Sequence, residues 1–236
     1  MEVTPVDHRR WGLGDVALGL ALGQAFAIVA TVVALGIGGW EPDGIPLWAG
    51  ALLQVPLWAG WLVAVALAGR KGDGVVPDFR VTARWPDLPV GLAIGVAVQV
   101  VVVPLLYLPV LRLLDLTSDD LSAPARELSE KAQGTWGWIL LAFLVVVGAP
   151  LAEELFYRGL MLQALRKRGL PDWAACVTSG VVFALMHFQA LQFLGLFVLG
   201  TVLAAMVVRT DRLGPAVTAH AAFNAATVVI LYLGSR

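Results

Sequence analysis

The chain has 236 residues, of which 59% are hydrophobic and 14% are charged, and its mean hydropathy is +0.82. A soluble domain carries about a quarter charged residues, so this composition excludes a water-soluble globule. The net charge of −1 offers no basic surface for nucleic acid, and the single cysteine, Cys176, excludes a disulfide within the chain.

Seven apolar segments follow one another along the chain, and a helix that crosses the bilayer needs about 20 such residues. They cover about Gly14–Ile37, Pro46–Gly69, Leu88–Leu111, a run that starts near Trp136, Asp172–Phe188, Ala190–Val208 and Pro215–Leu233. Pro104 and Pro109 predict a kink in the third segment. Runs such as Ile139–Val147 do not alternate as the strands of a membrane barrel do. The sequence therefore predicts an all-α integral membrane protein with a bundle of seven, or eight, transmembrane helices.

Basic residues gather in every second connection, which indicates the orientation of the helices. The third connection is an exception, because it mixes Arg112, Arg126 and Lys131 with acidic residues. Arg9 and Arg10 precede the first segment, whereas the loop 40–45 has no Lys or Arg. Further basic residues lie in the connections 70–84, 166–168 and 209–212. We expect an integral protein of a bacterial plasma membrane with a cytoplasmic N-terminus. The acidic loop 115–134 is either an amphipathic outer segment or a lid.

Several polar residues interrupt the later apolar segments, where ionisable groups are costly and usually functional. They are Glu153, Glu154, Arg158, His187, His220 and Asn224. If the turn between the fourth and fifth segments centres on Leu170, Glu153 lies 17 residues before it and His187 lies 17 residues after it. In an antiparallel helix pair the two side chains then lie at the same depth.

Helical spacing separates the roles of these residues. Glu154 and Arg158 are four residues apart, so they share a face and can pair, whereas Glu153 points about 100° away. A free carboxylate with an imidazole can take a proton from water, and a second His with an Asn can donate hydrogen bonds to an oxyanion. The pattern predicts a site that activates water. Polar contacts that hold helices together, or a proton relay, are the alternatives.

Three motifs in the second half of the chain resemble those of the CPBP family, which contains the CAAX prenyl proteases and bacteriocin-processing enzymes. Residues 153–158 match Glu-Glu-x-x-x-Arg, 183–187 match Phe-x-x-x-His and 220–224 match His-x-x-x-Asn. The resemblance covers about residues 136–233. It divides this single membrane domain into N-terminal helices with a polar outer loop, 1–135, and a catalytic core, 136–236.

The resemblance implies a glutamate-dependent intramembrane endopeptidase in which Glu153 and His187 activate the water. It implies an oxyanion hole made by His220 and Asn224, and orientation of the site by Glu154 and Arg158. The expected partners are a membrane-associated protein or peptide substrate and the lipid bilayer. No nucleic acid and no cofactor are expected.

Three rival functions stay open at this point. In a zinc metallopeptidase Glu153, His187 and His220 would be ligands, but the chain has no His-Glu-x-x-His signature. A non-catalytic protein for bacteriocin immunity or scaffolding would use the same motifs without turnover. A proton-coupled transporter would more often show inverted repeats, and the sequence has no internal repeat. Cys176 and Ser179 lie two to three turns from His187 on one helix, too far to act as nucleophiles with it.

Overall fold

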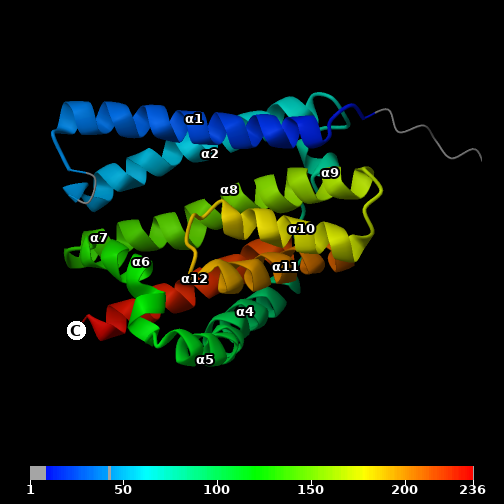
Figure 1. The fold of residues 1–236 in the computed structure, drawn as a ribbon. Coiled ribbons are helices and arrows are strands. Elements are labelled where there is room, and N and C mark those ends of the chain that lie inside the picture. Colours follow the sequence, from blue (N-terminus) through cyan, green and yellow to red (C-terminus); the bar gives the residue numbers. More distant parts are fainter. Residues whose placement is uncertain (1–8, 42–43, 236) are drawn as a thin grey trace, which may run out of the picture.

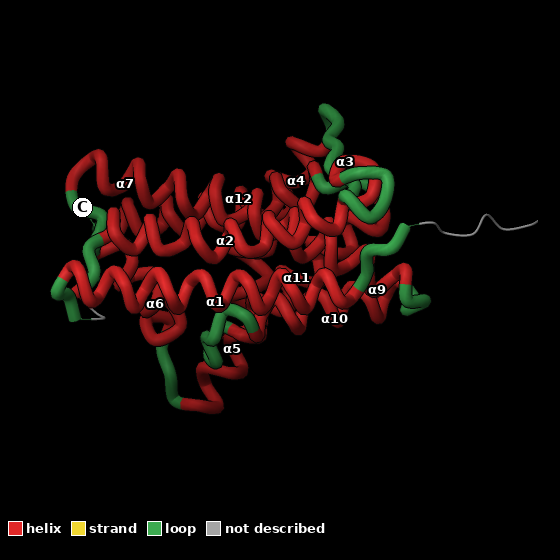
Figure 2. The backbone as a smooth tube through the Cα atoms, turned by 90° about the horizontal axis from the view of Figure 1, so that it is seen from above, coloured by secondary structure: helices red, strands yellow, loops and turns green. Residues whose placement is uncertain are grey.

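The protein is described from a computed structural model that covers residues 9–41 and 44–235. Residues 42 and 43 of the loop 40–45, which the predicted orientation uses, lie outside the described residues. Within the described ranges every regular element is helical and there is no strand (Figure 1). The predicted all-α membrane bundle is thereby confirmed. The long helices lie side by side along one direction, and α5 and its connection to α6 project from the bundle (Figure 2).

The first half of the chain forms α1 to α6. Their bounds are α1 Leu13–Gly38, α2 Leu47–Gly69, α3 Val75–Asp78, α4 Asp87–Ala97, the π-helical segment η2 Val98–Val102, α5 Val103–Leu114 and α6 Ser118–Glu130. The second half continues with α7 Gly134–Ala142, η3 Phe143–Gly148, α8 Ala149–Glu154, η4 Leu155–Met161, α9 Leu162–Lys167, α10 Asp172–Leu185, α11 Phe193–Thr210 and α12 Gly214–Gly234.

Six helical runs of the described chain are long and apolar enough to cross a membrane. They are α1, α2, α4 to α5, α7 to α9, α11 and α12. The fifth predicted segment is shorter than expected, because α10 has 14 residues and ends at Leu185 rather than Phe188. At 1.5 Å per residue it is about 21 Å long, less than the ~30 Å of a hydrocarbon core. The turn after α10 lies about midway along the α7–α9 run (Figure 1).

Two of the π-helical segments end two residues before a proline. Segment η2 precedes Pro104 and η3 precedes Pro150. A proline cannot donate to the carbonyl four residues earlier, and its ring clashes with that carbonyl. A wider turn relieves the clash. In the third segment, where a kink is predicted, this wider turn lies at residues 98–102 before Pro104, and Pro109 lies within α5.

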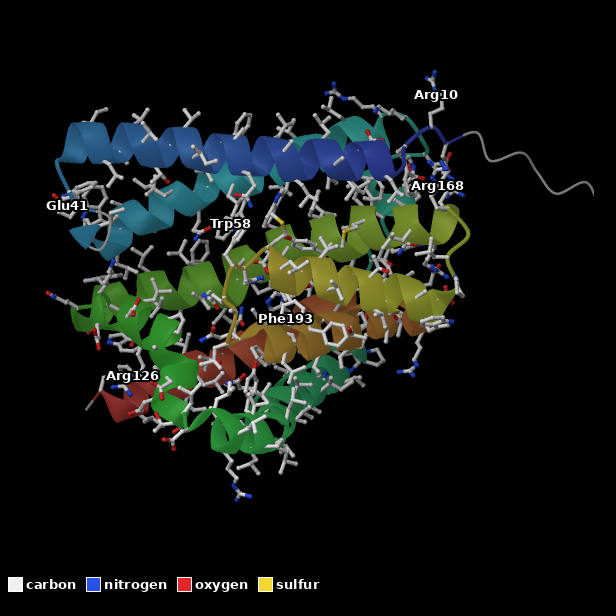
Figure 3. All side chains as sticks on the ribbon, in the orientation of Figure 1. Arg10, Glu41, Trp58, Arg126, Arg168 and Phe193 are labelled. Atoms are coloured by element: carbon white, nitrogen blue, oxygen red, sulfur yellow. The ribbon has the colours of Figure 1, made fainter. Side chains whose placement is uncertain are left out.

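The basic connections of the chain lie at one end of the bundle. Arg10 and Arg168 lie at this end, and Glu41 lies at the opposite end (Figure 3). We call these ends the basic end and the far end. Ion pairs join neighbouring segments at the basic end. One of them links Lys71 Nζ, after α2, to Asp15 Oδ1, in the first turn of α1, at 2.6 Å. Asp15 is thus part of an interfacial pair. Which end faces the cytoplasm stays a prediction.

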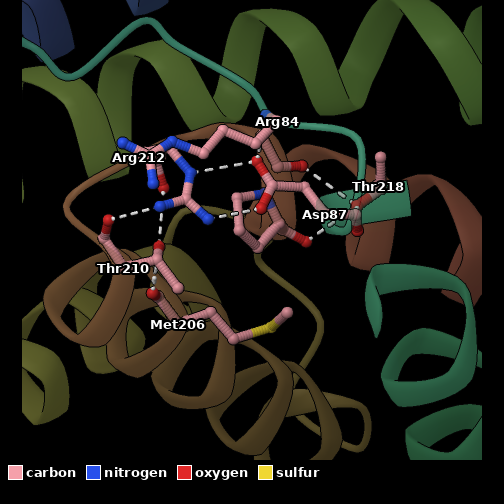
Figure 4. A network of polar contacts seen from close by, with 8 residues as sticks. Arg84, Asp87, Met206, Thr210, Arg212 and Thr218 are labelled. Atoms are coloured by element: carbon pink, nitrogen blue, oxygen red, sulfur yellow. Dashed lines mark hydrogen bonds and ion pairs between the residues drawn. The ribbon is translucent and has the colours of Figure 1, made fainter. Parts of the chain in front are cut away.

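A second polar network at the basic end ties the start of α4 to the turn between α11 and α12 (Figure 4). Arg212 donates to both carboxylate oxygens of Asp87, from Nη2 at 2.6 Å and from Nε at 3.2 Å. The Arg84 backbone N–H donates to the same carboxylate, and the Thr218 hydroxyl donates to the Asp87 backbone carbonyl. The ion pair with Asp87 raises the pKa of Arg212 above its ordinary value.

Small residues let the helices around the site approach closely, as is common in membranes. On α4, Gly91 and Gly95 face Thr218 and Ala219 of α12 with no space for a side chain. Gly180 and Gly200 play the same part between α10 and α11, where a Cβ on Gly200 would lie 2.9 Å from the Gly180 Cα. These contacts bring α10, α11 and α12 together around the middle of the α7–α9 run.

Candidate active site

Glu154 and Arg158 form an ion pair that is completely buried. Arg158 Nη1 donates to Glu154 Oε1 at 2.9 Å, and both side chains are 0% exposed. Arg158 Nη2 donates to the backbone carbonyl of Gly200 on α11, also at 2.9 Å. Such a contact needs α11 to lie close, which the missing side chain at Gly200 allows. Because an unpaired charge at this depth would be very costly, the two residues stabilise one another.

His220 on α12 joins this pair and connects it to Glu153. Its Nδ1 lies 2.8 Å from Glu154 Oε1, and because a carboxylate oxygen accepts, Nδ1 carries the proton. Its Nε2 lies 3.8 Å from Glu153 Oε2. Neighbouring glutamates of one helix therefore reach the two nitrogens of a single imidazole.

Glu153 differs from Glu154 in its surroundings. Its side chain is 12% exposed, and its Oε2 is buried without a hydrogen-bond partner. The residue lines a cavity of about 210 Å³. It is thus the carboxylate of the pair that has space beside it, as the 100° helical offset from Glu154 predicts.

His187 lies in the turn after α10 and meets the cluster through an aromatic ring. Its Nδ1 is 2.7 Å from the Phe183 carbonyl. Nδ1 is therefore the donor, and in the neutral imidazole Nε2 is left as an acceptor. The Phe183 ring has its centroid 4.6 Å from that of His187 and 5.7 Å from that of His220. The Arg158 Cζ lies over the same ring at 4.5 Å. Phe183 thus contacts three of the predicted site residues.

The turn that carries His187 is anchored by residues from the first half of the chain. The Tyr107 hydroxyl donates to the Leu191 carbonyl at 2.7 Å and accepts from the Gly195 backbone N–H at 3.0 Å. Gln192 Nε2 donates to the Leu121 carbonyl of α6 at 2.8 Å. The sequence analysis did not single out Tyr107 or Gln192. A polar side chain in an apolar stretch was the feature of the sequence that could have identified either residue.

Asn224 lies apart from the ionised cluster. Its Nδ2 donates to the Val145 carbonyl in η3 at 2.7 Å. In a π-helix that carbonyl would accept from the residue five positions later, which is Pro150 and has no N–H. Asn224 therefore satisfies a carbonyl that the proline leaves free, and its amide has a second N–H for another acceptor.

The structure brings Glu153, Glu154, Arg158 and His220 into direct contact and joins His187 to them through Phe183. Asn224 lies one turn after His220 and reaches η3 instead. Cys176 and Ser179 are buried elsewhere on α10, and the Ser179 hydroxyl faces the Tyr157 carbonyl.

The zinc alternative needs three ligand side chains gathered around one point. Zinc in a catalytic site takes three protein ligands at about 2.0–2.2 Å. Within the described residues, no three His, Cys, Asp or Glu side chains are grouped so that they could hold a metal ion. Of the three ligands in the zinc alternative, Glu153 and His220 are 3.8 Å apart, and His187 holds Nδ1 on a backbone carbonyl with Nε2 left free, so these two features do not distinguish the zinc alternative from a metal-free site. No step of the proposed reaction is assigned to a metal.

Residues 135–226 match the family model described as type II CAAX prenyl endopeptidase Rce1-like. This part of the chain is similar to Rce1-like domains. The match spans all three motifs and so confirms the family that they predict. Neither the curated proteins nor the solved structures include a match to the chain.

Proposed function

We propose that the Rce1-like domain is an intramembrane endopeptidase in which Glu153 and His187 activate the attacking water. The different surroundings of the two adjacent glutamates support this proposal. Glu154 is fully buried and bound to Arg158 and His220. Glu153 borders a cavity and has an oxygen without a hydrogen-bond partner. One carboxylate holds the site in place, and the other is available to accept a proton.

In the proposed reaction the water gives its proton to Glu153 as its oxygen bonds to the substrate carbonyl carbon. The Nε2 of His187, an acceptor in this tautomer, accepts a hydrogen bond from the other O–H of the water and so helps to activate it. When both nitrogens of His220 carry a proton, its Nε2–H donates to the substrate carbonyl oxygen as that oxygen becomes negative. Its Nδ1–H keeps its hydrogen bond to Glu154. The second N–H of Asn224 is the other donor. Collapse breaks the C–N bond, and the leaving nitrogen takes the proton from Glu153.

The proposed substrate is a membrane-associated protein or peptide, because the site lies among membrane-spanning helices. The family description names a prenyl endopeptidase, so a prenylated C-terminal peptide is one candidate. We also propose that the protein resides in a bacterial plasma membrane with its basic end in the cytoplasm, following the distribution of Lys and Arg.

A cleavage assay in lipid nanodiscs tests this function. The probes are a farnesylated C-terminal peptide and an unmodified transmembrane peptide, each with a fluorescent tag. Wild type should cleave at least one of them, and Glu153→Gln should fall to background because it keeps the shape and removes the base. Cys176→Ala is the control and should keep full activity. A Glu153→Gln variant that cleaves as fast as wild type would refute the assigned base.

The same assay separates the proposal from the zinc alternative. A strong chelator should leave wild-type cleavage unchanged. Loss of cleavage with chelator, followed by recovery with added zinc, would make Glu153, His187 and His220 ligands instead.

A further inference from the structure

The cavity beside Glu153 contains a second polar side chain. Gln54, the eighth residue of the apolar helix α2, lines the same cavity and is exposed rather than packed in the core. An amide in the middle of a membrane span usually faces protein or water, because hydrocarbon offers it no partner. Gln54 and Glu153 thus provide hydrogen-bonding groups on two sides of one cavity.

This cavity is suited to hold water. Its volume is about 210 Å³, and water occupies about 30 Å³ per molecule in the liquid. A buried water needs about two to four polar partners. Glu153 Oε2 has no hydrogen-bond partner in the protein, and Gln54 belongs to the same cavity lining. Both conditions for occupancy by water are therefore met.

A larger pocket of about 570 Å³ lies toward the far end of the bundle, where Lys131 and Gln133 contribute to its lining. Leu47 lines both this pocket and the Glu153 cavity. Leu47, Ala132 and Leu141 form a small hydrophobic cluster that is separate from the main core, with 7%, 5% and 2% exposure. Leu47 thus borders both spaces, and Ala132 and Leu141 pack against it.

We propose that Leu47 and Leu141 form a gate through which water passes from the far-end pocket to Glu153. Opening requires a change in the side-chain conformation of Leu47, because this residue lines both spaces. Gln54 is a positioning residue that holds the water beside the carboxylate. This route rests on the proposed hydrolytic function, since it supplies the water that the reaction consumes.

Cysteine accessibility in nanodiscs tests the gate without any cleavage. The probe is the permanently charged reagent 2-(trimethylammonium)ethyl methanethiosulfonate, applied to Ala51→Cys in a Cys176→Ala background. Ala51 lines the inner cavity and is 8% exposed. Adding Leu47→Ala should speed modification about tenfold or more, because a gate that is open ~0.1–10% of the time becomes permanently open. Adding Leu47→Phe should slow it.

The matched control is Leu52→Cys, the adjacent position, which is 61% exposed on the outer face of α2. It should stay unmodified with either residue at position 47, because a thiol in hydrocarbon does not form the reactive thiolate. Leu141→Ala provides a second way to open the gate if Leu47→Ala misfolds, and a thermal melt checks the fold of each variant.

An unchanged rate at Ala51→Cys in both opened variants would overturn the gate. Equal modification of Leu52→Cys would do so as well. Gated labelling without cleavage of any peptide would leave the route standing and count against the hydrolase. Cleavage without gated labelling would leave the hydrolase standing and refute the route.

Discussion

Two carboxylate–guanidinium pairs in this protein have similar geometry and different surroundings. Glu154 and Arg158 are 2.9 Å apart and both 0% exposed in the middle of the bundle. Asp87 and Arg212 are 2.6 Å apart at the basic end, where the arginine side chain is 19% exposed. In the interior, desolvation is compensated by the partner, by the Gly200 carbonyl that accepts from Arg158 and by the His220 imidazole that donates to Glu154. At the end, water and the lipid headgroups provide an alternative.

This difference shows what each pair contributes. The end pair joins α4 to the α11–α12 turn and so sets the packing of two helices. The interior pair fixes the position of the His220 imidazole, because Glu154 accepts from its Nδ1 while its Nε2 faces Glu153. The same chemistry holds helices together in one place and orients a candidate active site in the other. Substitutions in the two pairs should therefore have different consequences.

Arg158→Ala should have the largest effect. Removing one partner of a buried pair leaves an uncompensated charge, which costs about 3–5 kcal/mol. We expect that loss in the free energy of unfolding, measured by denaturing-detergent titration, together with loss of cleavage. Arg158→Lys should recover part of the stability. An Arg158→Ala variant as stable and active as wild type would show that the pair is not buried.

Asn224→Ala should have the next largest effect, and the effect should be on turnover. Losing one oxyanion donor typically lowers kcat by about 10²–10³-fold, so weak cleavage should remain with KM little changed. The experiment also tests the hydrogen bond to the Val145 carbonyl. Lower stability with unchanged kcat would mean that Asn224 only clamps η3.

Arg212→Ala should have a smaller effect, limited to stability. Hydrogen bonds to charged groups contribute about 1.5–3 kcal/mol, and Asp87 would keep the Arg84 backbone N–H and gain water. We expect a decrease in the free energy of unfolding in that range, with cleavage by the folded fraction unchanged. Equal losses for Arg158→Ala and Arg212→Ala would remove the distinction between interior and end.

The smallest effect should come from an exposed polar arrangement at the start of α6. Hydrogen bonds from the Thr117 backbone N–H and hydroxyl lower the pKa of Asp120. A lowered pKa in the folded state stabilises this cap above the unfolded value of about 3.9, and the contribution disappears as the pH falls through the folded pKa. Hydrogen exchange of α6, corrected for intrinsic rates, should increase below about pH 4.

Asp120→Asn is the control for this pH dependence. The variant should exchange at a rate that no longer changes across that range. A wild-type cap that is equally protected at pH 3 and pH 6 would contradict the role of the ionised carboxylate.

Composition and periodicity were sufficient to predict the helical membrane bundle, because long apolar runs have few other stable states in a bilayer. The pairing of Glu154 with Arg158 also followed from local geometry, since four residues make one helical turn. The motif spacing pointed to the family. These inferences depend on residues close together in the chain, or on whether a segment prefers lipid or water. Both can be read directly from the sequence.

Contacts between distant segments were decided only by the tertiary structure. The Gly200 carbonyl that receives Arg158 is a backbone atom, and nothing in the sequence marks it. The placement of Asn224 against Val145 depends on the π-helical segment before Pro150. The short length of α10 depends on how the turn that follows it packs against α5 and α6. The cavity shared by Gln54 and Glu153 exists only where α2, α6 and the α7–α9 run fail to fill the space between them, which is a property of three-dimensional packing and not of any one helix.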